Sequence, residues 1–123
     1  MHKSQLAGFI IDCDTDDVET AAEFWSKALG LETENEPGDS KYVLLKTRPD
    51  DVHVEVQKVD HPSRLHLDIE TNDIEAEVAR LEKLGARRIG PVQSWVVMEA
   101  PTGQRFCVVK PQRSGFEETA NSW

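Results

Sequence analysis

Five polar side chains on two strand-like segments are the best candidates for chemistry in this sequence. They are His53, Glu55, Arg64, His66 and Asp68. In residues 52–57 the polar positions alternate with valines, and in residues 64–68 they alternate with leucines. Residues two apart in a β-strand point to the same face. We therefore predict that these five side chains line one face of a sheet.

The side-chain types suggest a site for a small organic molecule. Histidine has the ordinary side-chain pKa nearest neutrality, so His66 is the predicted catalytic acid or base if a reaction takes place. Arg64 would hold a carboxylate or enolate oxygen. The other predicted ligand-binding residues are Glu55, His53, Asp68, Trp95 and Cys107.

Each of these residues also has a structural interpretation. His53 and Glu55 are consistent with a half-exposed strand whose polar residues face water. Arg64 and Glu55 could form a salt bridge. His66 and Asp68 could be a structural pair, with the aspartate accepting backbone N–H bonds near the start of a helix.

An internal repeat indicates which elements position these residues. The two copies are residues 12–19, DCDTDDVE, and residues 68–75, DIETNDIE. An aspartate that is present in both copies is more easily explained by the fold than by a site. His66 differs, because its counterpart in the first copy is Ile10. His66 is therefore the strongest functional candidate in the chain.

Each copy of the repeat predicts a strand that leads into an amphipathic helix. The preceding strands are predicted at residues 6–11 and 64–67. Asp16 and Asn72 are the predicted N-cap residues, and a glutamate three positions later completes a capping box. The predicted helix stops are Gly30 and Gly85, and the predicted capping-box glutamates are Glu19 and Glu75.

Three further strands are predicted after each helix, which gives two β-α-β-β-β modules. The predicted strands are 31–36, 41–47, 52–58, 86–90, 94–99 and 104–110. The breaks between them are Pro37-Gly38-Asp39, Pro49-Asp50-Asp51, Gly90-Pro91 and Pro101-Thr102-Gly103. Residues 112–123 are polar and patternless, and they predict a mobile tail or a strand added to a partner.

Composition restricts the class of protein and its partners. The chain has 123 residues, of which 38% are hydrophobic and 30% charged, as in a single globular α+β domain. The net charge of −9 disfavours nucleic acid and anionic membranes. No signal peptide or membrane segment is visible, so we expect a cytoplasmic protein. Cys13 and Cys107 lie in apolar runs and predict no disulfide.

The sequence resembles the vicinal oxygen chelate superfamily, specifically its glyoxalase-like and bleomycin-resistance-like domains. The likeness covers roughly residues 6 to 110. It lies in Asp12-Cys13, Phe24-Trp25, Leu29-Gly30, His66-x-Asp68, Leu84-Gly85-Ala86 and Pro101-x-Gly103-x-x-Phe106-Cys107-Val108. Ala100 departs from the pattern, because the family usually has Asp before this proline. The resemblance implies that the two βαβββ modules, at 6–58 and 64–110 within one domain over residues 1–111, form a curved mixed sheet around a cleft. We also expect a homodimer.

Metal-using members of the superfamily hold a divalent cation with His and Glu on the first, fourth, fifth and eighth strands. Glu55 and Cys107 lie equally far beyond Pro49 and Pro101, which places them in the fourth-strand and eighth-strand slots. Counting back from the two repeated aspartates places Gly8 and Arg64 in the other slots. Three of these four residues are poor ligands, so we expect no resident metal or other cofactor.

Three functions remain open at this point. The first is a protein that binds or sequesters a small organic molecule in the cleft without a metal. The second is a metal-dependent lyase, isomerase or dioxygenase that uses His53, Glu55 and His66, a ligand set suited to zinc or iron. The third is a metal-free acid–base enzyme that uses His66.

Overall fold

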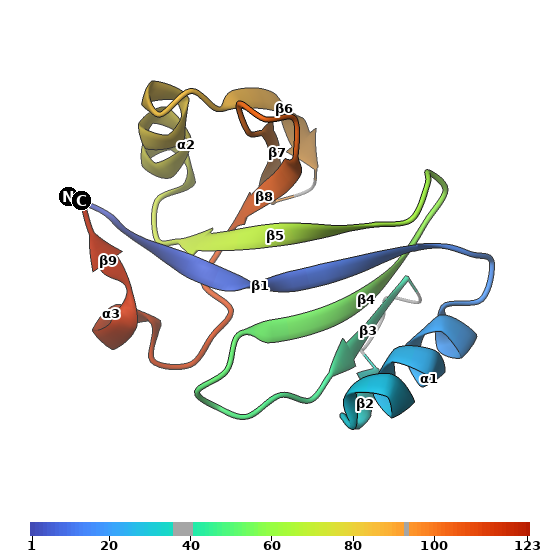
Figure 1. Ribbon diagram of the computed structural model, residues 1–123. Coiled ribbons are helices and arrows are strands. Elements are labelled where there is room, and N and C mark those ends of the chain that lie inside the picture. The colour runs from blue at the N-terminus through green and yellow to red at the C-terminus, as the bar shows by residue number, and fades with distance from the viewer. Residues whose placement is uncertain (36–40, 93) are drawn as a thin grey trace. The chain divides into compact units, whose positions relative to one another are not determined.

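The computed structural model describes residues 1–35, 41–92 and 94–123, and it has mixed α+β architecture (Figure 1). The chain divides into two compact units. The α1 unit is Gly8–Leu65, and the α2 unit combines Met1–Ala7 with His66–Trp123. Each unit has the predicted β-α-β-β-β order.

In the α1 unit, one helix packs on one face of a four-stranded mixed sheet. The elements are β1 (Lys3–Asp14, from Gly8 onward in this unit), α1 (Val18–Leu29), β2 (Thr33–Asn35), β3 (Tyr42–Leu45) and β4 (His53–Val59). The strand order is β2-β3-β4-β1, with β4 parallel to β1 and antiparallel to β3. The buried residues between helix and sheet are Val18, Ala22, Val43, Leu45 and Val56.

The α2 unit repeats this arrangement. Its elements are β5 (Arg64–Thr71, from His66 onward in this unit), α2 (Ile74–Lys83), β6 (Arg87–Val92), β7 (Trp95–Glu99), β8 (Arg105–Val109), α3 (Phe116–Thr119) and β9 (Asn121–Ser122). The strand order is β5-β8-β7-β6, with β8 parallel to β5. The buried residues beneath α2 are Val78, Leu81, Val96, Met98 and Val108. Within the described residues, neither this helix nor any other is long and apolar enough to cross a membrane.

Both main helices begin one residue later than predicted. Asp17 caps α1 by accepting a hydrogen bond from the backbone N–H of Thr20, and Asp73 caps α2 in the same way. The predictions of Asp16 and Asn72 as caps, with Glu19 and Glu75 as capping-box partners, were therefore wrong.

A threonine two residues before each cap explains the shift. The hydroxyl of Thr15 accepts the backbone N–H of Asp17, and the hydroxyl of Thr71 accepts that of Asp73. This side-chain turn extends the connection by one residue before the helix starts. The helix stops are as predicted, because Gly30 and Gly85 have φ angles of 70° and 106°.

The strand predictions are close, with one wrong break. Gly90 and Pro91 were predicted to interrupt a strand, but they lie inside β6, where the pairing with β7 shifts register between Arg88 and Gly90. Because β6 is an edge strand, a proline that lacks an N–H is tolerated there. The predicted break at 37–39 lies outside the described residues.

The prediction of a patternless tail was wrong. Beyond Gln112 the chain forms the helical turn α3 and the short strand β9, which pairs antiparallel with the start of β1. Phe116 is buried, and the carboxylate of buried Glu70 accepts the backbone N–H groups of Gln112 and Arg113. The anchors of this segment lie far away in the sequence, so its own local pattern does not reveal them.

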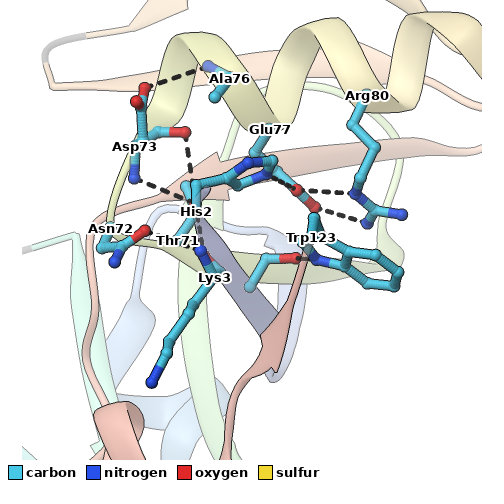
Figure 2. A network of polar contacts seen from close by, with 10 residues as sticks. His2, Lys3, Thr71, Asn72, Asp73, Ala76, Glu77, Arg80 and Trp123 are labelled. Carbon is cyan, nitrogen blue, oxygen red and sulfur yellow. Dashed lines mark hydrogen bonds and ion pairs between the residues drawn. The ribbon is translucent and has the colours of Figure 1, made fainter.

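Both ends of the chain converge on a buried carboxylate of α2, Glu77 (Figure 2). Arg80 donates two hydrogen bonds to it at 2.9 and 2.8 Å, and a ring nitrogen of His2 lies 2.8 Å from its Oε1. The Trp123 ring stacks on the Arg80 guanidinium, 3.8 Å from ring centroid to Cζ, and its N–H donates to Ser4. Burial raises the pKa of Glu77, but hydrogen bonds from Arg80, His2 and Ser4 outweigh it and lower the pKa below its ordinary 4.5.

We expect Glu77→Gln to lower the free energy of unfolding by about 1.5–3 kcal/mol, the contribution typical of hydrogen bonds to a charged group. The donors around Glu77 bond to two carboxylate oxygens, whereas a glutamine side chain offers only one acceptor oxygen. Denaturant unfolding measures the change. The exposed Glu75 of the same helix, which pairs with Arg88, is the control, and its Gln variant should change stability by less than about 0.5 kcal/mol. Equal effects of the two variants would contradict the role of Glu77.

This loss should depend on pH, because Glu77 has a lowered pKa in the folded state. Its contribution is fully present above the unfolded-state pKa of 4.5 and is lost as the pH falls through the lower folded-state pKa. The stability difference between the wild type and Glu77→Gln should therefore shrink below pH 4.5.

Candidate functional site

The α2 unit has a polar face on the side of its sheet away from α2. Alternate residues of β7 and β8, among them Met98 and Val108, pack beneath the helix. The residues between them point to the opposite face. Three of the predicted site residues of this unit lie close together on this face. They are His66, Asp68 and Cys107.

His66 and Asp68 form a partly buried pair on β5. The Nε2 of His66 lies 3.5 Å from Oδ1 of Asp68, and the His66 side chain is 12% exposed. Asp68 is 8% exposed as a residue, and within the described part of the chain its Oδ1 accepts no hydrogen bond. A buried carboxylate oxygen that accepts no hydrogen bond is unfavourable, so the ion pair with His66 is the interaction that offsets its burial.

Cys107 joins the pair through the register of two parallel strands. It lies opposite Asp68 in the pairing of β5 with β8, and paired residues point to the same face. Ligand atoms of His66, Asp68 and Cys107 all lie within 4.8 Å of one another. The sequence predicted each of these residues separately as a ligand contact, and the fold of the α2 unit brings the three together.

Trp95 lies at the start of β7 on the same polar face. Val97, two residues further along, pairs with Cys107, so Trp95 shares its direction. Trp95 is half-buried. This position is compatible with its predicted role as a wall of the site.

In the α1 unit, His53 and Glu55 lie on β4, on the face away from α1. Val54 and Val56 point toward the helix and pack in its cluster. The predicted alternation of the two polar residues with valines is confirmed. Glu55 pairs with Ile10 across the parallel ladder of β1 and β4.

Arg64 pairs with Asp12 in this unit. The Arg64 Nε lies 3.6 Å from Asp12 Oδ2, and the Asp12 side chain is 2% exposed. The arginine side chain is 46% exposed. A half-exposed guanidinium held at its Nε keeps donors for an anionic group of a ligand.

The strand registers correct one equivalence drawn from the sequence. Asp68 pairs with Cys107, whereas its repeat partner Asp12 pairs with Gln57. The counterpart of Cys107 is therefore Gln57, and the equal distance of Glu55 and Cys107 from their turn prolines was misleading. Gln57 donates a hydrogen bond to the Tyr42 hydroxyl at 3.0 Å. The sequence did not predict either of these residues as part of the polar face. No sequence signal distinguishes the two alignments, because residues 55 and 57 share a face.

The four metal slots assigned from the sequence do not fit a hard divalent cation. Gly8 offers no side chain, and a Cβ at this position would lie 2.2 Å from the backbone oxygen of His53. Arg64 is a permanent cation that repels metals. The only cluster of three or more potential ligands that the described residues form is His66, Asp68 and Cys107, and it includes a soft thiol.

We expect Gly8→Ala to lower the free energy of unfolding by about 3 kcal/mol or more. This is at least the upper end of the usual cost of adding atoms to a packed core, because the new Cβ would clash with backbone atoms, which cannot move aside as a side chain can. A histidine ligand at this position would be worse. Thermal and denaturant unfolding measure the effect. Gly90→Ala is the matched control, since a Cβ there meets nothing within 4 Å, and it should change stability by less than about 0.5 kcal/mol. A Gly8→Ala variant as stable as the wild type would show that a side chain fits at the first-strand metal position, which would contradict this argument.

Comparison with known proteins agrees with this geometry. A family model described as a glyoxalase-like domain matches residues 9–109. No curated protein matches the chain. A glyoxalase/bleomycin resistance protein/dioxygenase superfamily member from Vibrio splendidus has a similar structure, with a TM-score of 0.52 and 20% identity over 85% of this chain and 98% of that one.

Two further solved structures are similar at low identity. The Mn(II)-bound glyoxalase of Novosphingobium aromaticivorans has a TM-score of 0.60 and 16% identity, covering 93% of this chain and 44% of that one. Methylmalonyl-CoA epimerase of Mycobacterium tuberculosis has a TM-score of 0.58 and 16% identity, covering 87% of each chain. Likeness at these identities shows the fold alone.

Proposed function

Because the chain belongs to the glyoxalase-like domain family, we propose that it binds a small organic molecule through the polar face of the α2 unit. His66 is the central polar contact. Binding is carried out by the protein's own side chains and requires no resident metal.

The observation that carries this proposal is the pairing of His66 with a buried carboxylate that accepts no hydrogen bond at one oxygen within the described residues. A neighbouring carboxylate orients an imidazole ring and favours the N–H tautomer that faces it. An imidazole oriented in this way is a suitable polar contact for a ligand. A donor group on the ligand, such as a hydroxyl, could also reach Asp68.

Arg64 extends the proposed binding chemistry toward anions. It precedes His66 by two residues on the same strand, and residues at this spacing point the same way. Its half-exposed guanidinium suits a carboxylate or enolate oxygen. Trp95 supplies an apolar wall. His53 and Glu55 belong to the other unit and stay predictions from the sequence. We therefore favour small organic acids that also carry a carbonyl or hydroxyl group.

The test is a thermal-shift screen of such acids against the wild type and His66→Ala. A ligand at 100 times its Kd stabilises a protein by about 2.7 kcal/mol, which raises Tm by several degrees. We expect His66→Ala to lose most of this shift, because it removes the central hydrogen-bonding group.

The control variant is His61→Ala, since His61 is a half-buried loop residue whose ring contacts the Pro62 carbonyl. It should retain the full shift. Tm values without ligand show whether either variant is itself destabilised. No shift with any acid, or an equal shift in wild type and His66→Ala, would overturn the proposal.

A metal-free acid–base enzyme is a second candidate, favoured by the same pair. A histidine held by a buried carboxylate can remove a proton from carbon next to a carbonyl, while Arg64 stabilises the enolate oxygen. The proton passes to the His66 nitrogen and returns from it to the carbon.

Proton NMR in deuterated water tests this candidate with any acid that binds. The enzyme should exchange the hydrogen next to the carbonyl for deuterium, and His66→Gln should slow the exchange about 100-fold or more, the lower end of what general acid–base catalysis contributes. If an acid binds but its hydrogen is not exchanged for deuterium, this reaction is excluded and only the binding function remains.

A further inference from the structure

A row of charged residues lies at one end of the polar face of the α2 unit. Glu99 on β7 pairs with Arg105 on β8, and its carboxylate accepts hydrogen bonds from both Arg105 and Arg87. Glu99 and Arg105 point away from α2, because their neighbours Met98 and Phe106 pack in the cluster beneath that helix. None of these three charges takes part in the proposed function.

Strand register brings Arg105 beside His66. In the parallel ladder of β5 and β8, Leu67 pairs with Phe106. His66 and Arg105 each precede this pair by one residue, so they lie on adjacent strands and point to the same face. Adjacent strands are about 4.8 Å apart. A small acid held by His66 therefore lies within reach of the Arg105 side chain.

Glu99 holds the Arg105 guanidinium by one edge. The Nε of Arg105 donates to Oε2 of Glu99 at 3.2 Å, and Arg87 donates to Oε1 at 2.8 Å. A guanidinium has another edge, formed by its two terminal NH2 groups, which matches a carboxylate with two parallel hydrogen bonds. The Arg105 side chain is 37% exposed, which leaves room for such a contact.

The charge of this row suits an anion. Two arginines and one glutamate leave a local net charge of +1, in a chain whose formal net charge is −9. Hydrogen bonds from Arg87 and Arg105 lower the pKa of Glu99 below its ordinary 4.5, so this glutamate is ionised at neutral pH and keeps Arg105 in place. The carboxylate of Asp68 on the same face is paired with His66.

Apolar residues follow the charged row on this face. Val97 lies two residues from Glu99 on β7 and pairs with Cys107 on β8, and Trp95 lies two residues further. Both Val97 and Trp95 are half-buried. A rise of about 3.4 Å per residue and a strand spacing of about 4.8 Å place Val97 about 8 Å from Arg105. This separation suits an acid with a short apolar side chain.

We propose that Arg105 binds the carboxylate of the ligand and that Glu99 is its positioning residue. Val97 and Trp95 select acids that carry an apolar group. Because His66 lies beside Arg105, the group that His66 contacts is next to the carboxylate. The inference rests on the proposed function and narrows its substrate class to α-keto or α-hydroxy acids with a branched or aromatic side chain.

Isothermal titration with α-ketoisocaproate, a branched α-keto acid, tests the carboxylate contact. Arg105→Gln should weaken its binding roughly 10- to 100-fold, the loss typical of hydrogen bonds to a charged group. The amide of the same acid has no negative charge, so Arg105→Gln should leave its weaker affinity nearly unchanged. Glu99→Gln should weaken binding of the acid and not of the amide, whereas a merely structural role of Glu99 would weaken both.

The matched control for the lost arginine is Arg88→Gln. Arg88 is 40% exposed and pairs with Glu75 at 2.9 Å, much as Arg105 pairs with Glu99, but it lies on the face that carries α2. It should retain the full affinity for α-ketoisocaproate. Circular dichroism shows that each variant is folded.

Pyruvate tests the apolar selection, because it has the same α-keto acid group without the branched side chain. The wild type should bind α-ketoisocaproate at least about 10-fold more tightly than pyruvate, the lower end of what an apolar pocket discriminates. Val97→Thr replaces one methyl group by a hydroxyl and should reduce this preference.

Equal affinities of α-ketoisocaproate for the wild type and Arg105→Gln, or equal losses in Arg105→Gln and Arg88→Gln, would overturn the role of Arg105. No binding of α-ketoisocaproate to the wild type, or equal binding of pyruvate, would overturn the narrowed substrate class. The proposed function fails on different results, namely that no acid of the wider screen binds or that His66→Ala binds as well as the wild type.

Discussion

Each main helix covers one face of the sheet in its own unit, and the positions of the polar residues depend on this burial. In a strand beneath a helix, alternate residues enter an apolar core, so the residues between them must point away. Val54 and Val56 fix the direction of Glu55 in this way, and Val108 fixes that of Cys107. One-sided burial therefore aligns polar residues from separate strands without any direct interaction between them. A shift of one residue in either register would move the whole set into the core.

Buried carboxylates show which polar residues serve the fold. Glu70 holds the connection to the C-terminal segment through backbone N–H groups, and Glu77 holds both chain ends through Arg80 and His2. In both cases the cost of burying a charge is offset by several short hydrogen bonds. Asp68 is slightly more exposed, at 8%, and His66 lies 3.5 Å from its Oδ1 in place of several short hydrogen bonds. The comparison within one unit marks Asp68 as the residue whose burial the fold explains least.

The sequence predicted the parts of the structure that depend on local pattern. The repeat located both helices and their glycine stops, and alternation assigned Glu55 and His66 to polar strand faces. The helix caps were misplaced by one residue, because a threonine hydroxyl accepts a backbone N–H before the cap. The roles of Glu70 and Glu77 were missed, because their partners lie at distant positions in the chain. The grouping of Cys107 with Asp68 required the β5–β8 register, which no local pattern determines.

The two modules provide an internal comparison that separates fold from function. Strand register makes Ile10, Asp12 and Gln57 the counterparts of His66, Asp68 and Cys107. The first module forms the same β-α-β-β-β unit with an aliphatic residue and an amide at two of these positions. Neither the histidine nor the thiol is therefore needed to build the module. The aspartate is common to both, but Asp12 has an arginine partner, whereas Asp68 has a histidine and a thiol beside it. What distinguishes the second module is thus a change of chemistry around a carboxylate that both share.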